Sequence, residues 1–370
     1  MAAMDFLTPF YDRRHTRDTL VADLDGVLTT HASTVRALPF YSSAHPALWL
    51  DTAGTSRFSI SPIHPSEGVS LFACRLLTKD SEGRERSHDG RFFIWDHPEY
   101  PKIHVLLTLE ASFVFDRLHR LIERWFPRAV TTFITHRHLR RLLDSFRDEH
   151  QLSALVIKRA SFRVRFEEHD PSRPRRVLPV VSWPDLELHE AFDWVYQQNG
   201  WFQSLQFDAR RHQNTLATIS FTRQGITRTT GLFPQVFAGF VEPVCKTIDE
   251  NVRVFGQRSR RDRRDLSVRP LVIEFETDQI AESDERHRFV QAMKRLRAAS
   301  VSVLHGNPYV HLSVLDYYDG SVFDIWVLSG NNITIVPQMK GTVAAIKRVI
   351  HHIFDSYAEG RMKEYAEAQG

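Results

Sequence analysis

The second half of the chain carries one pattern twice, and this pattern constrains the fold more than any other feature. Short apolar strands joined by Gly-containing turns precede a long amphipathic helix, most clearly in ISFTRQG-ITRTTG and again in IWVLSGN-NITIVPQ. Runs of this kind favour antiparallel strands with one face covered by a helix. We therefore expect a duplicated antiparallel-sheet-plus-helix half, with units at 180–257 and 270–370. The units share little identity, so a chance match of two α+β units stays open.

The first half is predicted to be one domain, residues 1–169. Its first hundred residues are expected to be β-rich, with short strand candidates such as VSLFACRLL and RFFIWDH. Residues 102–166 then alternate strands with helices in β-α-β-α-β order, which predicts a small α/β segment with parallel pairing. The segment 170–179, with three Pro and three Arg, is the predicted linker, and 258–269 is a predicted basic connection. The chain as a whole is predicted to be α+β.

The composition is that of an ordinary globular chain. Its 370 residues are 42% hydrophobic and 25% charged, which excludes a disordered or collagen-like protein. Two cysteines, Cys74 and Cys245, give no disulfide framework and no CxxC zinc motif, which indicates a reducing compartment. The N-terminus lacks the apolar core of a signal peptide, and no apolar run reaches the roughly 18 residues that span a bilayer. We expect a cytoplasmic protein without a membrane partner.

Arginine dominates the basic residues. Of 48 Lys and Arg residues, 8 are Lys and 40 are Arg, against 45 Asp and Glu. Because guanidinium groups bind phosphate bidentately and stack on bases, this bias suits nucleic acid, although codon usage in a GC-rich genome produces the same bias. Clusters that share a face would bind phosphates without sequence preference. The candidate residues are Arg137, Arg140, Arg141, Arg163, Arg165, Arg258, Arg260, Arg261, Arg263 and Arg264.

These clusters support a first functional hypothesis, a non-enzymatic accessory or interaction factor that binds nucleic acid. A protein-interaction scaffold, with a protein partner in place of nucleic acid, is an alternative. The chain contains no GxxxxGK[ST], GxGxxG, GxSxG or HExxH motif, so the sequence does not support a P-loop enzyme, a dinucleotide-binding enzyme or a zinc protease. Whether the protein catalyses any reaction stays open.

One short segment points to chemistry. TLVADLDGVLTT, residues 19–30, places two aspartates beside a glycine in an apolar stretch. This segment resembles the first motif of the haloacid dehalogenase-like phosphohydrolases. The resemblance implies that Asp23 attacks phosphorus, that Asp25 acts as general acid and base, and that the carboxylates hold Mg²⁺. Under this alternative, the later motifs would fall on Thr132 or Thr135, Lys158, Asp316 and Asp319.

The Asp-Gly pair in the same segment also has a structural interpretation. Asp-Gly between apolar runs is a strong signal for a two-residue β-hairpin, because both central residues accept positive φ. The chain repeats the signal at Asp319-Gly320. We therefore expect either a hairpin or a phosphohydrolase strand around Asp25-Gly26. Outside the phosphohydrolase alternative, the sequence gives no metal ligands and no cofactor.

Overall fold

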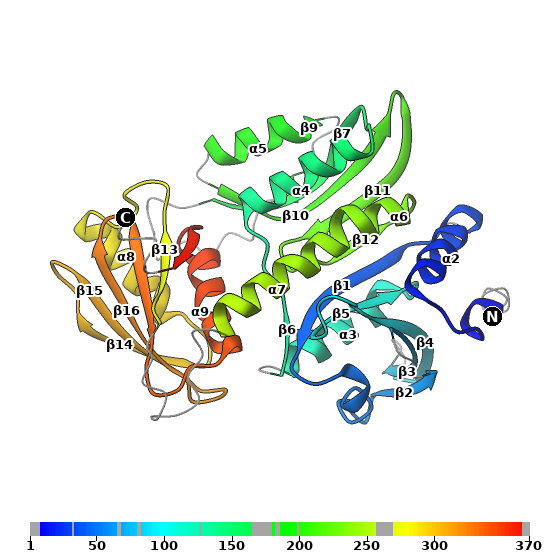
Figure 1. Ribbon diagram of the computed structural model, residues 1–370, viewed down its shortest axis with the longest axis horizontal. Helices are drawn as coiled ribbons and strands as arrows, with labels where there is room; N and C mark the ends of the chain where they lie inside the picture. Colours follow the sequence, from blue (N-terminus) through cyan, green and yellow to red (C-terminus); the bar gives the residue numbers. More distant parts are fainter. Residues whose placement is uncertain are drawn as a thin grey trace. The chain divides into compact units, whose positions relative to one another are not determined.

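The computed structural model in Figure 1 combines helices with antiparallel sheets, so the predicted α+β class is confirmed. The chain divides into two compact units, Met1–Asp249 and Glu250–Gly370. The predicted linker 170–179 lies outside the described residues, and strands on either side of it pair within one sheet. The structure describes residues 8–31, 33–64, 68–79, 83–125, 128–164, 180–181, 186–197, 200–256 and 269–364.

The first unit is built on one twelve-stranded sheet. Its order is β2-β3-β4-β5-β1-β12-β11-β10-β7-β8, with β6 beside β1 and β9 beside β7. The strands are β1 (Val35–Ser42), β2 (Phe58–His64), β3 (Val69–Lys79), β4 (Glu85–Asp96), β5 (Ile103–Thr108), β6 (Ala129–Thr131), β7 (Ala154–Val164), β8 (Val180–Val181), β9 (Leu186–Glu187), β10 (Gly200–Arg211), β11 (Asn214–Thr222) and β12 (Thr227–Thr229). All described pairings in this sheet are antiparallel.

The parallel pairing predicted for 102–166 is therefore wrong, although the order of elements is right. Strand β5, helix α3 (Ser112–Arg124) and strand β6 follow one another as predicted. Both strands pair antiparallel with β1, so they run in the same direction but do not touch as partners. Strand β1, from earlier in the chain, lies between β5 and β6. The local sequence of 102–166 gives no sign of this insertion.

Helix α2 (Arg17–Thr30) occupies the segment where the Asp-Gly signal predicts a strand or hairpin, and that prediction is wrong. Thr16 begins the helix with a capping box, a reciprocal pair of side-chain and backbone hydrogen bonds. Leu20, Leu24 and Leu28 are buried at a spacing of four residues, which places them on one side of a helix. The helical repeat of apolar side chains outweighs the turn preference of one Asp-Gly pair.

One face of β7, β10 and β11 is covered by helices (Figure 1). Phe240 connects the two layers, because its ring lies 6.2 Å from Phe207, 5.6 Å from Phe221 and 4.6 Å from Phe146, centre to centre. Burial of such rings supplies much of the core energy. The covering elements are α4 (His136–Glu149), α5 (Leu188–Gln197), α6 (Phe233–Val236), the π-helical turn η3 (Phe237–Val241) and the part of α7 (Glu242–Gly256) that belongs to this unit, up to Asp249.

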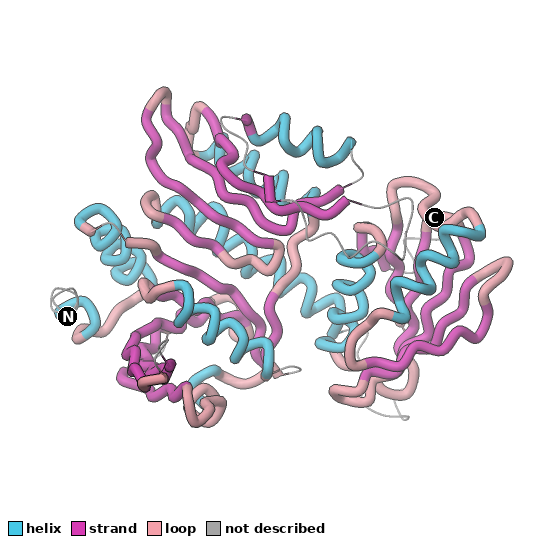
Figure 2. Tube along the Cα trace, turned by 180° about the vertical axis from the view of Figure 1, so that it is seen from behind, coloured by secondary structure: helices cyan, strands magenta, loops and turns pink. Residues whose placement is uncertain are grey.

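Helix α3 covers the opposite face, but only over the other half of the sheet. Its core residues and those beneath it are Val114, Phe115 and Leu118 of α3, with Leu38, Phe40, Phe92 and Leu106 of the strands. On this same face, β7, β10 and β11 have no helix over them among the described residues, and Figure 2 shows these strands in front of the helices. An antiparallel sheet can leave one face to solvent in this way.

The second unit has its own antiparallel sheet, in the order β14-β15-β16-β17-β13-β18. Side chains such as Leu312 and Ile325 are fully buried on one face, whereas His311 and Trp326 stack on the other with ring centroids 3.5 Å apart. The elements are β13 (Leu271–Glu274), α8 (Ser283–Lys294), β14 (Ala299–His305), β15 (Val310–Asp316), β16 (Val322–Ser329), β17 (Asn332–Pro337), α9 (Val343–Ser356) and β18 (Arg361–Glu364).

The two predicted repeat units differ in their sheets. Strands β10, β11 and β12 of the first belong to the twelve-stranded sheet, whereas the second forms a separate six-stranded sheet.

Cys74 and Cys245 are buried free thiols. Across the described part of the chain, no helix combines the length and the apolar character needed to cross a membrane.

Candidate functional site

The two aspartates of the phosphohydrolase-like segment have separate structural partners. Asp23 forms an ion pair with Arg13, and its Oδ2 lies 3.3 Å from Nδ1 of His15. Asp25 accepts a hydrogen bond from the backbone N–H of Phe233 at 3.0 Å. Because successive helical residues are about 100° apart, the two carboxylates point about 200° apart around α2. They do not converge on one ligand as a strand-end aspartate pair does.

Four of the residues proposed for the later motifs have partners within the fold, and the first of them, Thr135, caps α4 by accepting from the His138 N–H at 3.2 Å. Lys158 lies 3.1 Å from a carboxylate oxygen of Asp208 in the neighbouring strand. Asp316 is fully buried and pairs with Arg348 at 2.5 Å. Asp319 accepts a 2.9 Å hydrogen bond from the backbone N–H of Ser321, two residues later in the same turn. These contacts fix a strand pair, a strand-to-helix contact and a turn, and they lend no support to a Mg²⁺ site.

The predicted arginines that the structure describes fall on two faces of the first unit. Arg137, Arg140 and Arg141 are exposed on α4, where Arg140 pairs with Asp193 at 3.0 Å. Arg163 lies on β7 and is half-buried. The remaining candidates lie outside the described residues: Arg165, Arg258, Arg260, Arg261, Arg263 and Arg264.

The sheet face that α3 partly covers carries a row of polar residues that are direct neighbours across five strands. Its Arg36 and Arg228 end contacts α3, through Ser112 and Asp116, and its β11, β10 and β7 end has no described helix over it. Arg36 of β1 lies opposite Arg228 of β12, which lies opposite Ser220 of β11. Ser220 lies opposite Gln206 of β10, and Gln206 lies opposite Arg159 of β7. Partner residues in an antiparallel pair point to the same face. We call these five residues the basic row.

Alternation along the strands fixes the direction of the basic row. Ile219 and Phe221 flank Ser220 and are fully buried under the helices. Ser220 therefore points the other way, since successive side chains of a strand alternate. The register between β7 and β10 shifts at Gln206. This β-bulge leaves Lys158 and Arg159 both exposed beside β10.

The face around the basic row is lined by small hydroxyl groups. The hydroxyls of Ser161 and Ser204 lie 2.6 Å apart across β7 and β10. Thr218 donates to Asp208 at 2.8 Å, and Asp208 also holds Lys158. Hydroxyl, amide and guanidinium groups are the side chains that contact phosphate and sugar in nucleic-acid complexes.

Arg36 and Arg228 are like charges placed directly opposite each other, an arrangement that destabilises a sheet. Burial and then the charge of Arg228 lower the pKa of the Arg36 guanidinium. Arg36 donates to the Glu110 carbonyl at 2.5 Å, and Arg228 lies 3.6 Å from Asp116. No described carboxylate forms an ion pair with Arg36 or with Arg159 of the same row. Asp116 and Glu110 thus partly neutralise the Arg36 and Arg228 end of the row, whereas Arg159 is exposed and unneutralised by an ion pair with any described carboxylate.

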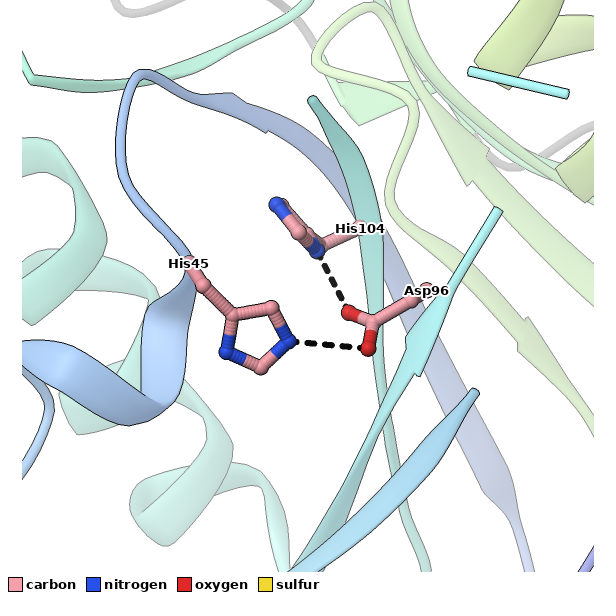
Figure 3. Close-up of side chains that lie close together, drawn as sticks. All are labelled: His45, Asp96 and His104. Carbon is pink, nitrogen blue, oxygen red and sulfur yellow. Dashed lines mark hydrogen bonds and ion pairs between the residues drawn. The ribbon is translucent and has the colours of Figure 1, made fainter. Parts of the chain in front are cut away.

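A second group of functional side chains lies elsewhere in the first unit (Figure 3). Asp96 of β4 and His104 of β5 are cross-strand partners, and His45 precedes the turn η2 (Pro46–Leu48). The Asp96 carboxylate bridges both rings, at 2.9 Å from Nε2 of His45 and 2.6 Å from Nδ1 of His104. The side chains of His104, Asp96 and His45 are 2%, 20% and 39% exposed.

The two histidines lower the pKa of the Asp96 carboxyl. Burial alone would raise its pKa, but hydrogen bonds from His104 and His45 and their charges outweigh burial, so the pKa lies below its ordinary value. The hydrogen bond that His45 donates to Asp96 raises the pKa of His45 in return. The sequence shows no motif here, because two of the three residues become neighbours only through strand pairing and the third through a turn.

Comparison with known proteins adds no family to this description. A scan of the chain against protein-family models found no match, and a search of the curated proteins found none. Function is therefore inferred from the geometry of the basic row and its surroundings.

Proposed function

We propose that the protein binds nucleic acid on the sheet face that carries the basic row, with the phosphate backbone lying along the row from the edge of α3 to β7. The supporting observation is the alignment of Arg36, Arg228 and Arg159 in one cross-strand row, with polar side chains between them. Adjacent strands lie about 4.8 Å apart, so the row from β1 to β7 spans about 19 Å. A row of that length suits an extended polyanion better than a single phosphate.

The opposed arginine pair supports an anionic ligand. Arg36 is held in place by the carbonyls of Glu110 and Thr34, at 2.5 Å and 3.2 Å. A phosphate between Arg36 and Arg228 would accept hydrogen bonds from both and relieve their repulsion. The guanidinium groups are thus positioned before a ligand arrives, which lowers the entropic cost of binding.

The contacts proposed here carry no base specificity. Arginine, serine and glutamine side chains on a flat sheet face meet phosphate and sugar, and these groups are the same in every sequence. Binding should therefore weaken steeply with salt, because each neutralised phosphate releases counterions. The proposal keeps the accessory-factor hypothesis and moves its centre from the arginines of α4 to the sheet.

The test compares two arginines that differ in face but not in charge. The full chain is titrated against a fluorescently labelled 20-nucleotide single strand and a matched duplex, with anisotropy as the readout. Arg159→Ala removes an exposed member of the basic row, and Arg141→Ala removes an exposed arginine of α4 on the helix-covered side. We expect a severalfold loss of affinity in Arg159→Ala and none in Arg141→Ala.

Two results would contradict the proposal. One is the absence of binding to either nucleic acid at about 50 mM salt, where electrostatic binding is strong. The other is equal affinity for the unaltered chain, Arg159→Ala and Arg228→Gln. Arg228→Gln is included because it breaks the opposed pair while keeping a polar side chain on β12.

A further inference from the structure

His45, Asp96 and His104 form a compact set of potential metal ligands. One nitrogen of each ring and one carboxylate oxygen lie within 4.8 Å of one another. Imidazole nitrogens with a carboxylate suit borderline transition-metal ions, whereas Mg²⁺ and Ca²⁺ prefer sets made of oxygen. We propose that these three side chains bind a divalent transition-metal ion, with Zn²⁺ as the representative ion. The proposal does not depend on nucleic-acid binding.

Two of the three ligands are fixed by the sheet. Asp96 and His104 are opposite each other on β4 and β5, and the His104 ring lies 5.7 Å from that of Phe40, centre to centre. His104 is almost fully buried. Ligands set on strands and packed against a core hold their geometry better than ligands on loops. A metal ion would therefore meet a partly preformed site.

The spacing of the ligand atoms is close to that of a metal site. Ligands around a tetrahedral Zn²⁺ lie about 3.3 Å apart when the metal–ligand bonds are about 2.0–2.1 Å long. The Asp96 oxygens lie 2.9 Å and 2.6 Å from the histidine nitrogens, distances set by shared protons. An ion would take the place of those protons and separate each histidine nitrogen from its carboxylate oxygen by about 0.4–0.7 Å. Three protein ligands leave a fourth position for water.

Both histidines donate to Asp96 through the nitrogen that would bind the ion, so each must move that proton to its other ring nitrogen, and in His45 that other nitrogen is already engaged. The His45 Nδ1 accepts a hydrogen bond from the Ala47 backbone N–H at 3.2 Å, so the neutral ring carries its proton on Nε2. Metal binding at Nε2 requires the proton on Nδ1, which ends that contact and loosens the start of η2. Trp49 follows η2 directly, and its ring lies 4.8 Å from that of Trp125. Tryptophan fluorescence should therefore report metal binding.

The competing explanation is a clamp without metal, in which Asp96 bridges two histidines only to fasten the turn to the sheet. Both explanations predict that Asp96→Asn lowers stability, because a charged acceptor is lost. They differ in metal uptake. A clamp takes up no ion at this place, whereas a metal site takes up one ion per chain and loses it when a ligand is removed.

The experiment uses the full chain after chelator treatment, titrated with Zn²⁺ by calorimetry and with Co²⁺ by visible absorption. We expect one Zn²⁺ per chain, a Co²⁺ spectrum typical of mixed nitrogen and oxygen ligands, and a change in tryptophan emission. His45→Ala, which removes the most exposed ligand and spares the core, should weaken Zn²⁺ binding more than tenfold. His64→Ala, a histidine on β2 outside the group, is the matched control and should bind as the unaltered chain does.

Asp96→Asn provides a second variant with nearly the same shape. It should fold and also lose more than tenfold in Zn²⁺ affinity. The proposal is overturned if the unaltered chain takes up no Zn²⁺, or if His45→Ala and Asp96→Asn bind Zn²⁺ as tightly as His64→Ala does. In the second case the ion is held by other histidines of the chain, and the group is a clamp.

Discussion

Replacing Asp25 with alanine tests whether this residue caps a helix or serves chemistry. Its carboxylate accepts the Phe233 N–H at 3.0 Å, at the start of α6. Helix α6 continues through η3 into α7, so this N-terminus belongs to one long helix. Loss of a side-chain acceptor at a helix N-terminus costs about 0.5–2 kcal/mol. A carboxylate there also interacts with the helix dipole by about 0.3–1 kcal/mol.

We therefore expect Asp25→Ala to lower the free energy of unfolding by about 1–2 kcal/mol, the middle of these ranges. For a unit of this size, about 1 kcal/mol corresponds to about 2–4 °C in Tm. The variant should melt about 2–8 °C below the unaltered chain. Asp25→Asn keeps an acceptor oxygen without the charge and should lose about half as much. Asp148→Ala, with a side chain 70% exposed at the end of α4, is the control and should shift stability by less than about 0.5 kcal/mol.

The assay is thermal unfolding followed by circular dichroism, together with hydrolysis of a generic phosphoester in Mg²⁺. An Asp25→Ala protein that melts with the Asp148→Ala control would refute the capping role. So would a Mg²⁺-dependent hydrolysis that disappears in Asp25→Asn while Tm is unchanged. The second result would instead favour the phosphohydrolase that the segment 19–30 resembles.

Three further substitutions test the packing. Asp316→Ala removes the buried partner of Arg348 and should lower the free energy of unfolding, measured by urea denaturation, by about 3–5 kcal/mol. A loss below about 1 kcal/mol would contradict this prediction. Gly225 has φ +76°, and an added Cβ would lie 2.8 Å from Thr132 Cγ2. Gly225→Ala should therefore lower the free energy of unfolding by more than about 1 kcal/mol. An unchanged Tm would contradict this and show that the turn relaxes. Burial lowers the pKa of Lys347 to about 7 in the folded chain, whereas the unfolded chain keeps a pKa of about 10. Between these values the unfolded chain binds more protons than the folded chain, so stability should rise with pH from about 7 to about 10. Lys347→Met should raise Tm at pH 7 and remove this rise, and melts at pH 7 and 9 check both.

Local pattern predicted elements well where one face of a strand or helix is apolar. In the second unit, Ile333 and Ile335 alternate with Asn332 and Thr334, so β17 lies where the sequence NITIVPQ predicts a strand. The same reasoning failed at α2, where the Asp-Gly pair was given more weight than the spacing of the buried leucines. A turn signal two residues long carries less energy than one apolar face along fourteen residues.

Strand pairing limits what sequence can give for the site. Arg159 and Arg163 are visible as a basic strand, but Arg36 and Arg228 join Arg159 only through the register of five strands. The partners are far apart in the chain, and no local motif records their register. The same holds for Asp96 and His45, whose contact depends on where a turn places one ring.

The salt dependence of nucleic-acid binding measures how many phosphates the basic row neutralises. If Arg36, Arg159 and Arg228 each neutralise one phosphate of a single strand, affinity should fall about 20-fold between 50 and 200 mM salt. With one contact fewer, Arg159→Ala should fall only about 7-fold over that range, while Arg141→Ala keeps the 20-fold loss. Equal salt dependence in the unaltered chain and Arg159→Ala would contradict phosphate binding by the basic row, as would a smaller dependence in Arg141→Ala alone.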